Sequence, residues 1–361
     1  MVSPPVTTTR QCHPGADSIH VVDPRYDGRW EQLTRSTTGS IFTSSPWIRA
    51  VCDTYGFEPR GTVATDVAGE PIAGLADVEI RDFRGVRISS LPFSDRADPV
   101  LRSSKAWIPL ASGLVWSDAP FTLRCLDGTP PAVDPMFRTE HRAAWHGTSL
   151  TGSPADLFGR LHPSARRNVR VAGRNGVEIS VSATLEAVRE FHALHLDLRK
   201  RKYRLLAQPV EFFERIWTEF HREDGIVTML AFIDGQPVAG ALFLVWQDVA
   251  YYKFGASLAS HLAARPNDAL FWTAMQWASS RGLSSIDWGL SELDQPGLVA
   301  YKRKWASVER QILTIRSGNQ LSDEGADVTR LLTELTRLLT QDDVPSRVTA
   351  MAGALLYRYF C

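Results

Sequence analysis

The chain has 361 residues, of which 44% are hydrophobic, and its 40 basic side chains balance 40 acidic ones. This length suits two domains of about 150 to 180 residues, and the zero net charge excludes attraction of nucleic acid by the molecule as a whole. No run approaches the roughly 18 apolar residues of a membrane span, and the four cysteines lack metal-ligand spacing, so we expect a reduced, cytoplasmic protein without a metal.

The first half of the chain is predicted to begin with a loose segment, because residues 1–24 are rich in proline and threonine. A helix is expected at 45–55, where proline stands in the first turn and apolar residues recur at four-residue spacing. A hairpin around 69–74 and a strand at 86–91 follow. Residues 96–149 mix short strand-like runs with proline and show no clear pattern.

The second half shows a clearer succession of elements. The expected elements are an arginine-bearing helix that follows residues 154–157 and ends near 173 or 176, a strand at 177–181, a helix capped by Thr184, a helix at 209–221, strands at 226–233, 238–246 and 249–254, a helix at 267–280, a strand at 285–288, a helix at 326–339 and an apolar segment at 348–360. This order is that of an acetyltransferase-like α/β domain, which has two helices, three antiparallel strands, a helix and a strand.

One short phrase occurs twice, as GEPIAG at 69–74 and as GQPVAG at 235–240. Thr62 and Thr228 precede the two copies at the same distance. A Gly-x-Pro turn between β-prone runs is typical of a hairpin, and the following Ala-Gly pair leaves a bare strand where a backbone or a ligand can come close. Chance is the alternative, since these are common turn residues, but the matching flanks favour duplication of one fold.

Several further phrases resemble the Fem family of aminoacyl-tRNA-dependent peptidyltransferases and related two-domain proteins of the acetyltransferase (GNAT) superfamily. They are SPW at 45–47, LPFSD at 91–95, RRNVR at 166–170, NGV at 175–177, PN at 266–267, DWG at 287–289 and YKRKW at 301–305. The resemblance covers nearly the whole chain. It implies an α/β protein of the α+β type, with two tandem GNAT-like domains whose mixed, largely antiparallel central sheets are flanked by helices.

The resemblance also implies a domain organisation. We expect the loose segment 1–24, a first GNAT-like domain at 25–149, a second at 150–318, and a helical tail at 319–361 that packs back on the first domain. Some family members carry a long helical arm for tRNA, and no charged heptad segment of that kind exists here. The chain therefore resembles the compact, armless type, and we expect a monomer.

Lys302 is the first catalytic candidate. In the family, a lysine in an aromatic-Lys-x-x-aromatic phrase lies near the ester, and here Tyr301 and Trp305 flank Lys302. A lysine there can neutralise a terminal phosphate or the developing oxyanion. The alternative is a surface lysine on a loop that enters the last strand.

Four arginines, Arg166, Arg167, Arg170 and Arg174, are candidates for binding phosphate, because the guanidinium fork matches phosphate oxygens. Spacing by three and four residues places the last three on one helical face. The alternative is a solvent-facing basic helix. Arg49 lies near a basic residue that the family uses to hold nucleotide phosphates.

Three further residues complete the predicted site. Asp95 is a candidate proton acceptor or anchor for the incoming amine, with a turn-capping role as the alternative. Asp287, at a strand end, and Tyr252, on the central strand of the second domain, are candidate cleft-lining residues, and ordinary packing is the alternative for both.

These residues favour an acyltransferase that forms an amide by direct attack of an amine on an ester, because no nucleophile triad is recognisable. The resemblance implies aminoacyl-tRNA as donor, no cofactor, and an amine-bearing small-molecule, peptide or nucleotide-linked acceptor, in peptidoglycan precursor or natural-product synthesis. The first alternative is a CoA-dependent N-acyltransferase of polysaccharide or lipid metabolism, which residues 264–269 disfavour because they hold no glycine for a pyrophosphate turn. A non-catalytic ligand-binding scaffold is the second alternative.

The apolar, arginine-bearing tail is expected to pack on the protein, and the alternative is that it contacts a membrane surface.

Overall fold

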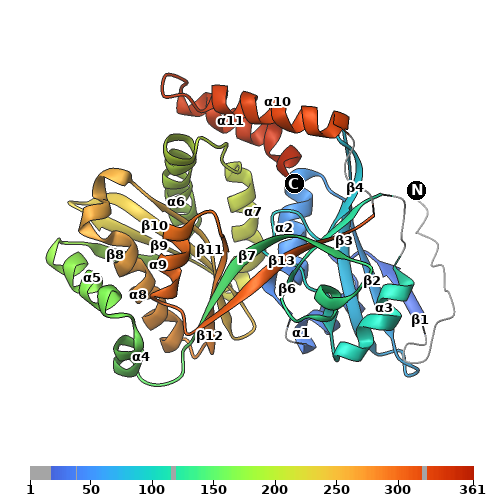
Figure 1. Cartoon of the computed structure of the whole chain (residues 1–361). Helices are drawn as coiled ribbons and strands as arrows, with labels where there is room; N and C mark the ends of the chain where they lie inside the picture. Colours follow the sequence, from blue (N-terminus) through green and yellow to red (C-terminus); the bar gives the residue numbers. More distant parts are fainter. Residues whose placement is uncertain (1–17, 38, 115–118, 319–322) are drawn as a thin grey trace. The chain divides into compact units, whose positions relative to one another are not determined.

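The computed structural model describes residues 18–37, 39–114, 119–318 and 323–361. They form two compact units (Figure 1). The first unit comprises the described residues up to Arg142 and those from Gln311 to Val328, and the second comprises Ala143–Arg310 and Thr329–Cys361. The described strands pair into one 13-stranded mixed sheet, and each unit holds a part of it with its own flanking helices, which confirms the predicted fold class.

The sheet of the first unit joins hairpins with one parallel pair. Its strand order is β1 (Ser18–Val22), β2 (Pro59–Thr65), β3 (Pro71–Asp82), β4 (Gly85–Ser89), β6 (Phe121–Leu126) and β13 (Val308–Ser317), and β5 (Val100–Leu101) also pairs with β3. The pair of β4 and β6 is parallel and the other pairs are antiparallel. Its helices are α1 (Gly28–Ser36), α2 (Ser45–Tyr55) and α3 (Trp107–Gly113).

The sheet of the second unit repeats this pattern. Its strand order is β7 (Arg138–Ser149), β12 (Ser285–Glu292), β11 (Val249–Ser257), β10 (Gln236–Trp246), β9 (Ile226–Ile233) and β8 (Glu178–Ser182), with β11 and β12 parallel. Helices α6 (Leu185–Leu198) and α7 (Val210–Phe220) cover one face and α8 (Pro266–Ser280) covers the other (Figure 1). The remaining helices are α4 (Pro154–Arg160), α5 (Pro163–Arg174), α9 (Pro296–Arg303), α10 (Asp323–Leu339) and α11 (Ser346–Leu356).

The two copies of the repeated phrase form equivalent hairpins, as the sequence predicts. Strands β2 and β3 pair around the first copy and β9 and β10 around the second, and each ladder contains a bulge near its proline. The bare Ala-Gly start of each second strand is covered by a helix. A Cβ on Gly74 would lie 2.8 Å from Leu33 and 2.9 Å from Trp30, both of α1, and one on Gly240 would lie 2.8 Å from Phe191 of α6. At both sites the close neighbours are therefore large apolar side chains of a covering helix.

This packing predicts the effect of filling either glycine. Gly74→Ala and Gly240→Ala should each lower the free energy of unfolding by about 1–3 kcal/mol, because the added methyl group overpacks a buried contact with large apolar side chains. Chemical denaturation measures the change. Gly28→Ala is the control, since no atom lies within 4 Å of a Cβ built there. Equal stability of all three variants would contradict this account of the repeat.

The last strand of each sheet comes from the other half of the chain, which corrects the expected boundaries at 149 and 318. Strand β13 pairs with β6 of the first unit, from Ile312↔Leu126 to Ser317↔Phe121, and β7 pairs with β12 of the second. The chain crosses between the units inside both strands. Sequence pattern does not show such an exchange, because the apolar alternation of a strand does not specify its partner.

The two ends of the chain also differ from expectation. Part of the segment 1–24, expected to be loose, is strand β1, which pairs with β2, while residues 1–17 lie outside the described residues. The described tail groups with the second unit from Thr329 onward, whereas the sequence predicts packing on the first. There α11 lies so close to the backbone at Ala207 that a Cβ on Gly353 would meet its carbonyl oxygen.

Candidate functional site

A fork between two parallel strands forms the candidate site in the second unit. Strands β11 and β12 are paired only from Val249↔Ser285 to Tyr251↔Asp287, and beyond this point no further pairing joins them. A cavity of about 590 Å³ lies alongside the unpaired part of β11. Its lining residues are Leu198, Lys202, Tyr203, Tyr252, Gly255, Ala256, Ser257, Leu262, Asn267, Phe271, Gln295, Gly297, Leu298 and Tyr301.

The cavity wall is aromatic with few polar groups. Burial raises the pKa of Tyr252 and of Tyr301, so both phenols stay neutral at physiological pH and can donate a hydrogen bond. Tyr252 lies against Gly255, where a Cβ would be only 1.7 Å from the phenol oxygen. Lys202 is the single charged residue among those that line this cavity, and it is exposed. The wall suits an apolar or planar group attached to an anion.

The corresponding fork of the first unit is occupied by its own chain. Strands β4 and β6 pair only at Ile88↔Phe121 and Ser89↔Thr122. After Ser89 the chain stays on β6, since Ala97 N donates to Arg124 O at 2.8 Å and Leu126 N donates to the Asp98 carboxylate at 2.7 Å. Residues 90–98 thus stay hydrogen-bonded to β6, whereas the corresponding part of β11 in the second unit is not paired with β12 after Tyr251.

This occupied fork contains the predicted candidate Asp95. The turn before it is strained, with Leu91 at φ +40° and Phe93 at φ +61°, and Trp47 Nε1 donates to Ser94 Oγ at 2.8 Å. Asp95 is half-buried in this turn. It belongs to the first unit, whereas Lys302 belongs to the second.

Lys302 is buried at the end of helix α9 and does not line the cavity. Its ammonium group donates to Leu290 O at 2.9 Å and to Gly289 O at 3.3 Å, and lies 5.8 Å from the ring centre of Tyr252. The helical position differs from the loop that the sequence suggested. The charge is therefore placed behind the cavity wall, with Tyr252 between it and the cavity.

The two acceptors of Lys302 lie at an irregularity in β12. The pairing with β7 shifts register between Asp287 and Leu290, and Gly289 has φ +71°. Asp287 is buried and its carboxylate accepts from Gly289 N at 2.7 Å, so it stabilises this bulge and does not line the cavity. Trp305 is likewise a buried core residue. Of the predicted site residues Tyr252, Asp287, Tyr301 and Trp305, Tyr252 and Tyr301 line the cavity and the other two do not.

The predicted arginines lie on helix α5, outside the cavity. The helix lasts to Arg174, and Arg167, Arg170 and Arg174 are exposed, as their spacing predicts. Arg170 lies 5.5 Å from the ring centre of Phe158, and half-buried Arg166 donates to Gly159 O at 3.4 Å. The described part of the chain offers no ion pair to these four arginines. Their charge is therefore available to an anion.

Arg49, the remaining phosphate candidate, lies in the first unit. It is half-buried on helix α2, whose bounds match the predicted helix, and it donates to Arg25 O at 2.7 Å. This contact fixes the guanidinium against the backbone that leads into helix α1. The structure therefore does not bring Arg49 together with the arginines of α5 in one unit.

The N-terminus of helix α8 lies at the cavity, since Asn267 lines it. Pro266 has no N–H, and Asp268 N already donates to Arg265 O at 3.1 Å. The buried Asp268 carboxylate accepts from Asn168 Nδ2 at 3.3 Å, and burial raises its pKa against the lowering effect of Asn168 and nearby cations. This first turn offers few amide donors and holds its own carboxylate, so it suits a pyrophosphate poorly.

Sequence reasoning missed the wall contributed by residues 198–203. Lys202 and Tyr203 line the cavity from a π-helical turn, Arg199–Tyr203, that continues α6. The sequence signal for this wall was the run of basic residues at 199–204, but such a run is also typical of an ordinary solvent-exposed helix end. Across the described ranges, no group of three His, Cys, Asp or Glu residues could hold a metal ion. Over the same ranges, no helix has the length and apolarity needed to cross a bilayer.

Residues 159–303 match the family model described as "Acetyltransferase (GNAT) domain". The structure of FemX is similar over 85% of this chain and 99% of FemX, with a TM-score of 0.60 and 13% identity. L-PGS from Bacillus licheniformis has a TM-score of 0.52 and 13% identity, over 88% and 99% of the two chains. A conserved protein of unknown function from Bacteroides thetaiotaomicron has a TM-score of 0.52 and 10% identity, over 80% and 95%.

No curated protein matches the sequence significantly. At these identities the similar structures show the fold, and they confirm the predicted resemblance to Fem-like proteins of the GNAT superfamily at that level. Together with the domain match over residues 159–303, they show that the chain has a GNAT-type fold.

Proposed function

We propose that the protein transfers an aminoacyl group from aminoacyl-tRNA to the amine of a small-molecule, peptide or nucleotide-linked acceptor, and so forms an amide. The observation that carries this proposal is the first turn of α8 at the cavity. Pro266 lacks a donor, Asp268 N is engaged, and the Asp268 carboxylate is buried beside them. These features disfavour binding of the CoA pyrophosphate at this turn. A donor whose phosphates bind at another place on the protein fits better.

The exposed arginines of α5 offer a place for such charge. Arg167, Arg170 and Arg174 present three guanidinium groups on one face, and a tRNA acceptor stem carries phosphates at regular spacing. A basic face on one helix is consistent with zero net charge, because binding depends on local potential. The similarity to FemX and to L-PGS, a lysyl-phosphatidylglycerol synthetase, supports aminoacyl transfer as the class of reaction.

Within the cavity, the reaction needs an amine held against an ester carbonyl and a donor for the developing oxyanion. The neutral phenols of Tyr252 and Tyr301 can donate hydrogen bonds there, and the buried ammonium of Lys302 raises the positive potential behind Tyr252. Lys202 can pair with a phosphate or carboxylate of the bound substrate. The amine attacks the carbonyl carbon, the C–N bond forms, and the ester C–O bond breaks to release the tRNA hydroxyl. The amine's proton passes to solvent or to the leaving oxygen.

One experiment separates this function from the two alternatives. The purified protein is incubated with a pool of charged tRNA and a mixture of amines, and product masses are read by mass spectrometry. RNase treatment should abolish transfer, and acetyl-CoA should leave the melting temperature unchanged. A thermal shift with acetyl-CoA and transfer that resists RNase would establish a CoA-dependent N-acyltransferase. Binding of an amine without turnover under either donor would establish a ligand-binding scaffold.

Replacing the α5 arginines tests the tRNA surface. In the triple variant Arg167→Gln, Arg170→Gln, Arg174→Gln, we expect the KM for charged tRNA to rise by about tenfold, and the slope of log affinity against log salt concentration to fall by about 2. The matched control removes three exposed arginines of the second unit elsewhere, at Arg189, Arg215 and Arg222. Equal salt slopes for the two triple variants would exclude α5 as the binding face.

A further inference from the structure

The cavity wall missed by sequence reasoning is held from behind by the C-terminal tail. The π-helical turn Arg199–Tyr203 and the following Arg204 are called the rim below. Lys202 and Tyr203 of the rim line the cavity, whereas Lys200 is 3% exposed and lies away from it. π-Helical turns within longer helices occur often at functional sites, because the extra residue changes the direction of the side chains that follow.

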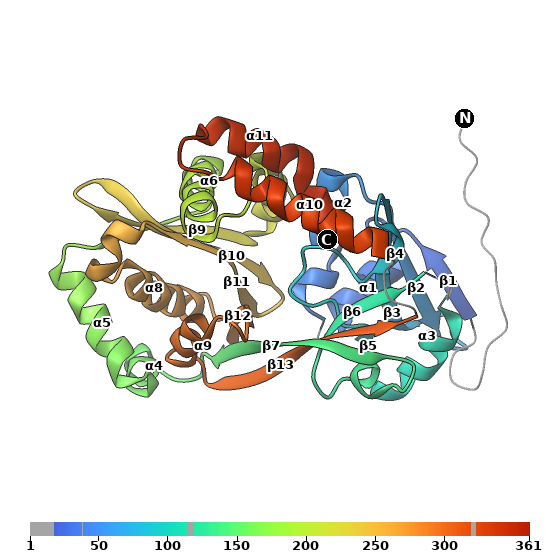
Figure 2. The ribbon, with the colours of Figure 1, turned by 45° about the horizontal axis from the view of Figure 1, so that its top comes forward.

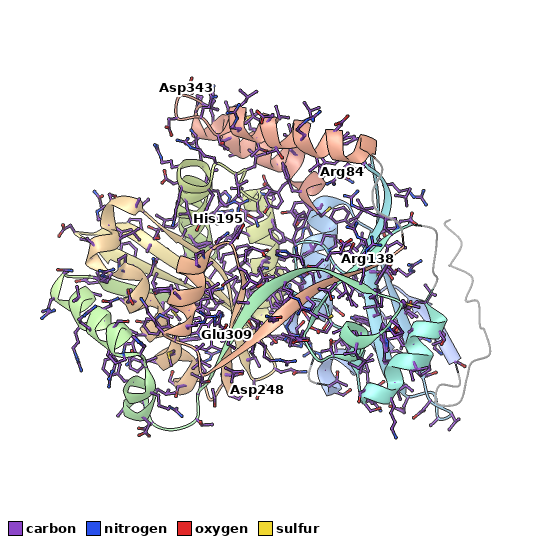
Figure 3. All side chains as sticks on the ribbon, in the orientation of Figure 1. Arg84, Arg138, His195, Asp248, Glu309 and Asp343 are labelled. Carbon is purple, nitrogen blue, oxygen red and sulfur yellow. The ribbon has the colours of Figure 1, made fainter. Side chains whose placement is uncertain are left out.

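The tail supplies the acceptors for the two cations that flank the lining pair. The Lys200 ammonium donates to Val344 O. The Arg204 guanidinium forms a two-point pair with the Asp342 carboxylate, at 2.9 Å for both bonds, and donates to Thr340 O at 2.8 Å. All three acceptors lie in the turn between α10 and α11, where Figure 3 labels Asp343.

This turn is itself fixed against the second unit. Thr349 Oγ1 donates to Leu339 O at 2.9 Å, which ties the two tail helices together. Helix α11 meets the backbone at Ala207 through Gly353, where a Cβ would lie 2.3 Å from the carbonyl oxygen. Figure 2 shows the helical pair beside α6, the helix that the rim continues. The acceptors are thus presented from a packed hairpin.

We infer that the C-terminal hairpin α10–α11 is part of the active-site architecture, and that Lys200 and Arg204 are positioning residues that keep Lys202 and Tyr203 at the cavity. Arg204 has φ +53°, a left-handed conformation that a non-glycine residue keeps only where surrounding contacts hold it. The pair with Asp342 and the bond to Thr340 O are those contacts. The contacts that hold the rim are a property of the fold and do not depend on the proposed function. Only the expected effect of the rim on catalysis rests on that function.

Amide hydrogen exchange tests the hold without any substrate. In Lys200→Met, which keeps the length of the side chain and removes its charge, exchange over residues 198–208 should be about tenfold faster than in the wild type. Arg204→Asp and Asp342→Arg should each have a similar effect, and the double variant, which reverses the pair but lacks the donor to Thr340 O, should restore part of the protection. The control is Arg189→Gln. Arg189 lies on α6, the helix that the rim continues, and this change removes its exposed ion pair with Glu214, so exchange at 198–208 should stay unchanged.

The kinetic arm asks whether the rim matters for substrate. With pooled charged tRNA and the acceptor amine found for the wild type, KM for the acceptor should rise by about fivefold in Arg204→Asp with a smaller change in kcat, and the reversed pair should recover KM. Unchanged exchange at 198–208 in all single variants would overturn the inference. So would faster exchange with unchanged KM. Absence of transfer by the wild type would instead reject the proposed function, and the exchange data would still decide whether the tail holds the rim.

Discussion

Lys302→Met is expected to lower the free energy of unfolding by about 3 kcal/mol, because it removes a charged donor from two backbone carbonyls. The methionine side chain fills a similar volume, so cavity formation contributes little. Removing the ammonium also removes the cost of burying its charge, yet this gain is smaller than the loss of two charge-assisted hydrogen bonds to Gly289 and Leu290. Urea denaturation measures the change.

The same variant separates a structural role from a chemical one. Lys304→Met is the matched control, because Lys304 is half-buried beside Tyr301 at the same helix end and, within the described ranges, its ammonium forms no hydrogen bond. Its stability should stay within about 1 kcal/mol of the wild type. If Lys302→Met kept full stability while kcat fell, the bulge would not depend on this lysine. The residue would then act on the reacting atoms alone, as the family resemblance first suggested.

Gly255→Ala is expected to reduce kcat/KM for aminoacyl transfer by about a hundredfold, because displacing a positioned group by roughly 1 Å has effects of this size. The new methyl group would overlap the Tyr252 phenol oxygen, and Tyr252 cannot move far. Its ring packs at 5.0 Å from Phe271 and 5.4 Å from Phe243. The phenol must therefore shift within the cavity wall.

Two comparisons make this result interpretable. Gly159→Ala on α4 adds the same methyl group where no atom lies within 4 Å, and should keep wild-type activity. Tyr252→Phe removes only the hydroxyl group and shows how much of the loss belongs to it. Near-ultraviolet circular dichroism detects the displaced ring independently of any assay. A wild-type spectrum and wild-type kcat/KM for Gly255→Ala would show that Tyr252 does not set the shape of the site.

Much of the local structure could be predicted from sequence because its causes are local. Proline in the first turn and glycine at the end define helix α2 within the predicted bounds, and Thr184 caps α6 by accepting from Ala187 N. The region 96–149 gave no clear prediction, yet it contains α3, β6 and all of β7. These strands are specified by partners far away in the chain, as with Ile312↔Leu126, and not by their own pattern.

The site was harder to predict than the fold. Two of the predicted residues do line the cavity. Tyr301 was predicted because it belongs to the phrase YKRKW, and Tyr252 because it lies on a central strand. Lys200 and Lys202 stand in one run of positive charge, and only the π-helical turn separates the buried lysine from the one at the cavity. Lys302 was a catalytic candidate because of the family resemblance and Asp95 because a carboxylate can accept a proton, and the structure places the two residues in different units.

By itself, the sequence determined that this protein is a doubled α/β fold of GNAT type, because turn residues, caps and hydrophobic periodicity act over a few positions. The tertiary structure alone decided which fork is open, since hydrogen bonds from residues 90–98 fill one and leave the other beside a cavity. It also decided that the final strands exchange between halves and that the tail supports the rim. Such pairings depend on the free energy of the whole folded chain, and no short segment encodes them.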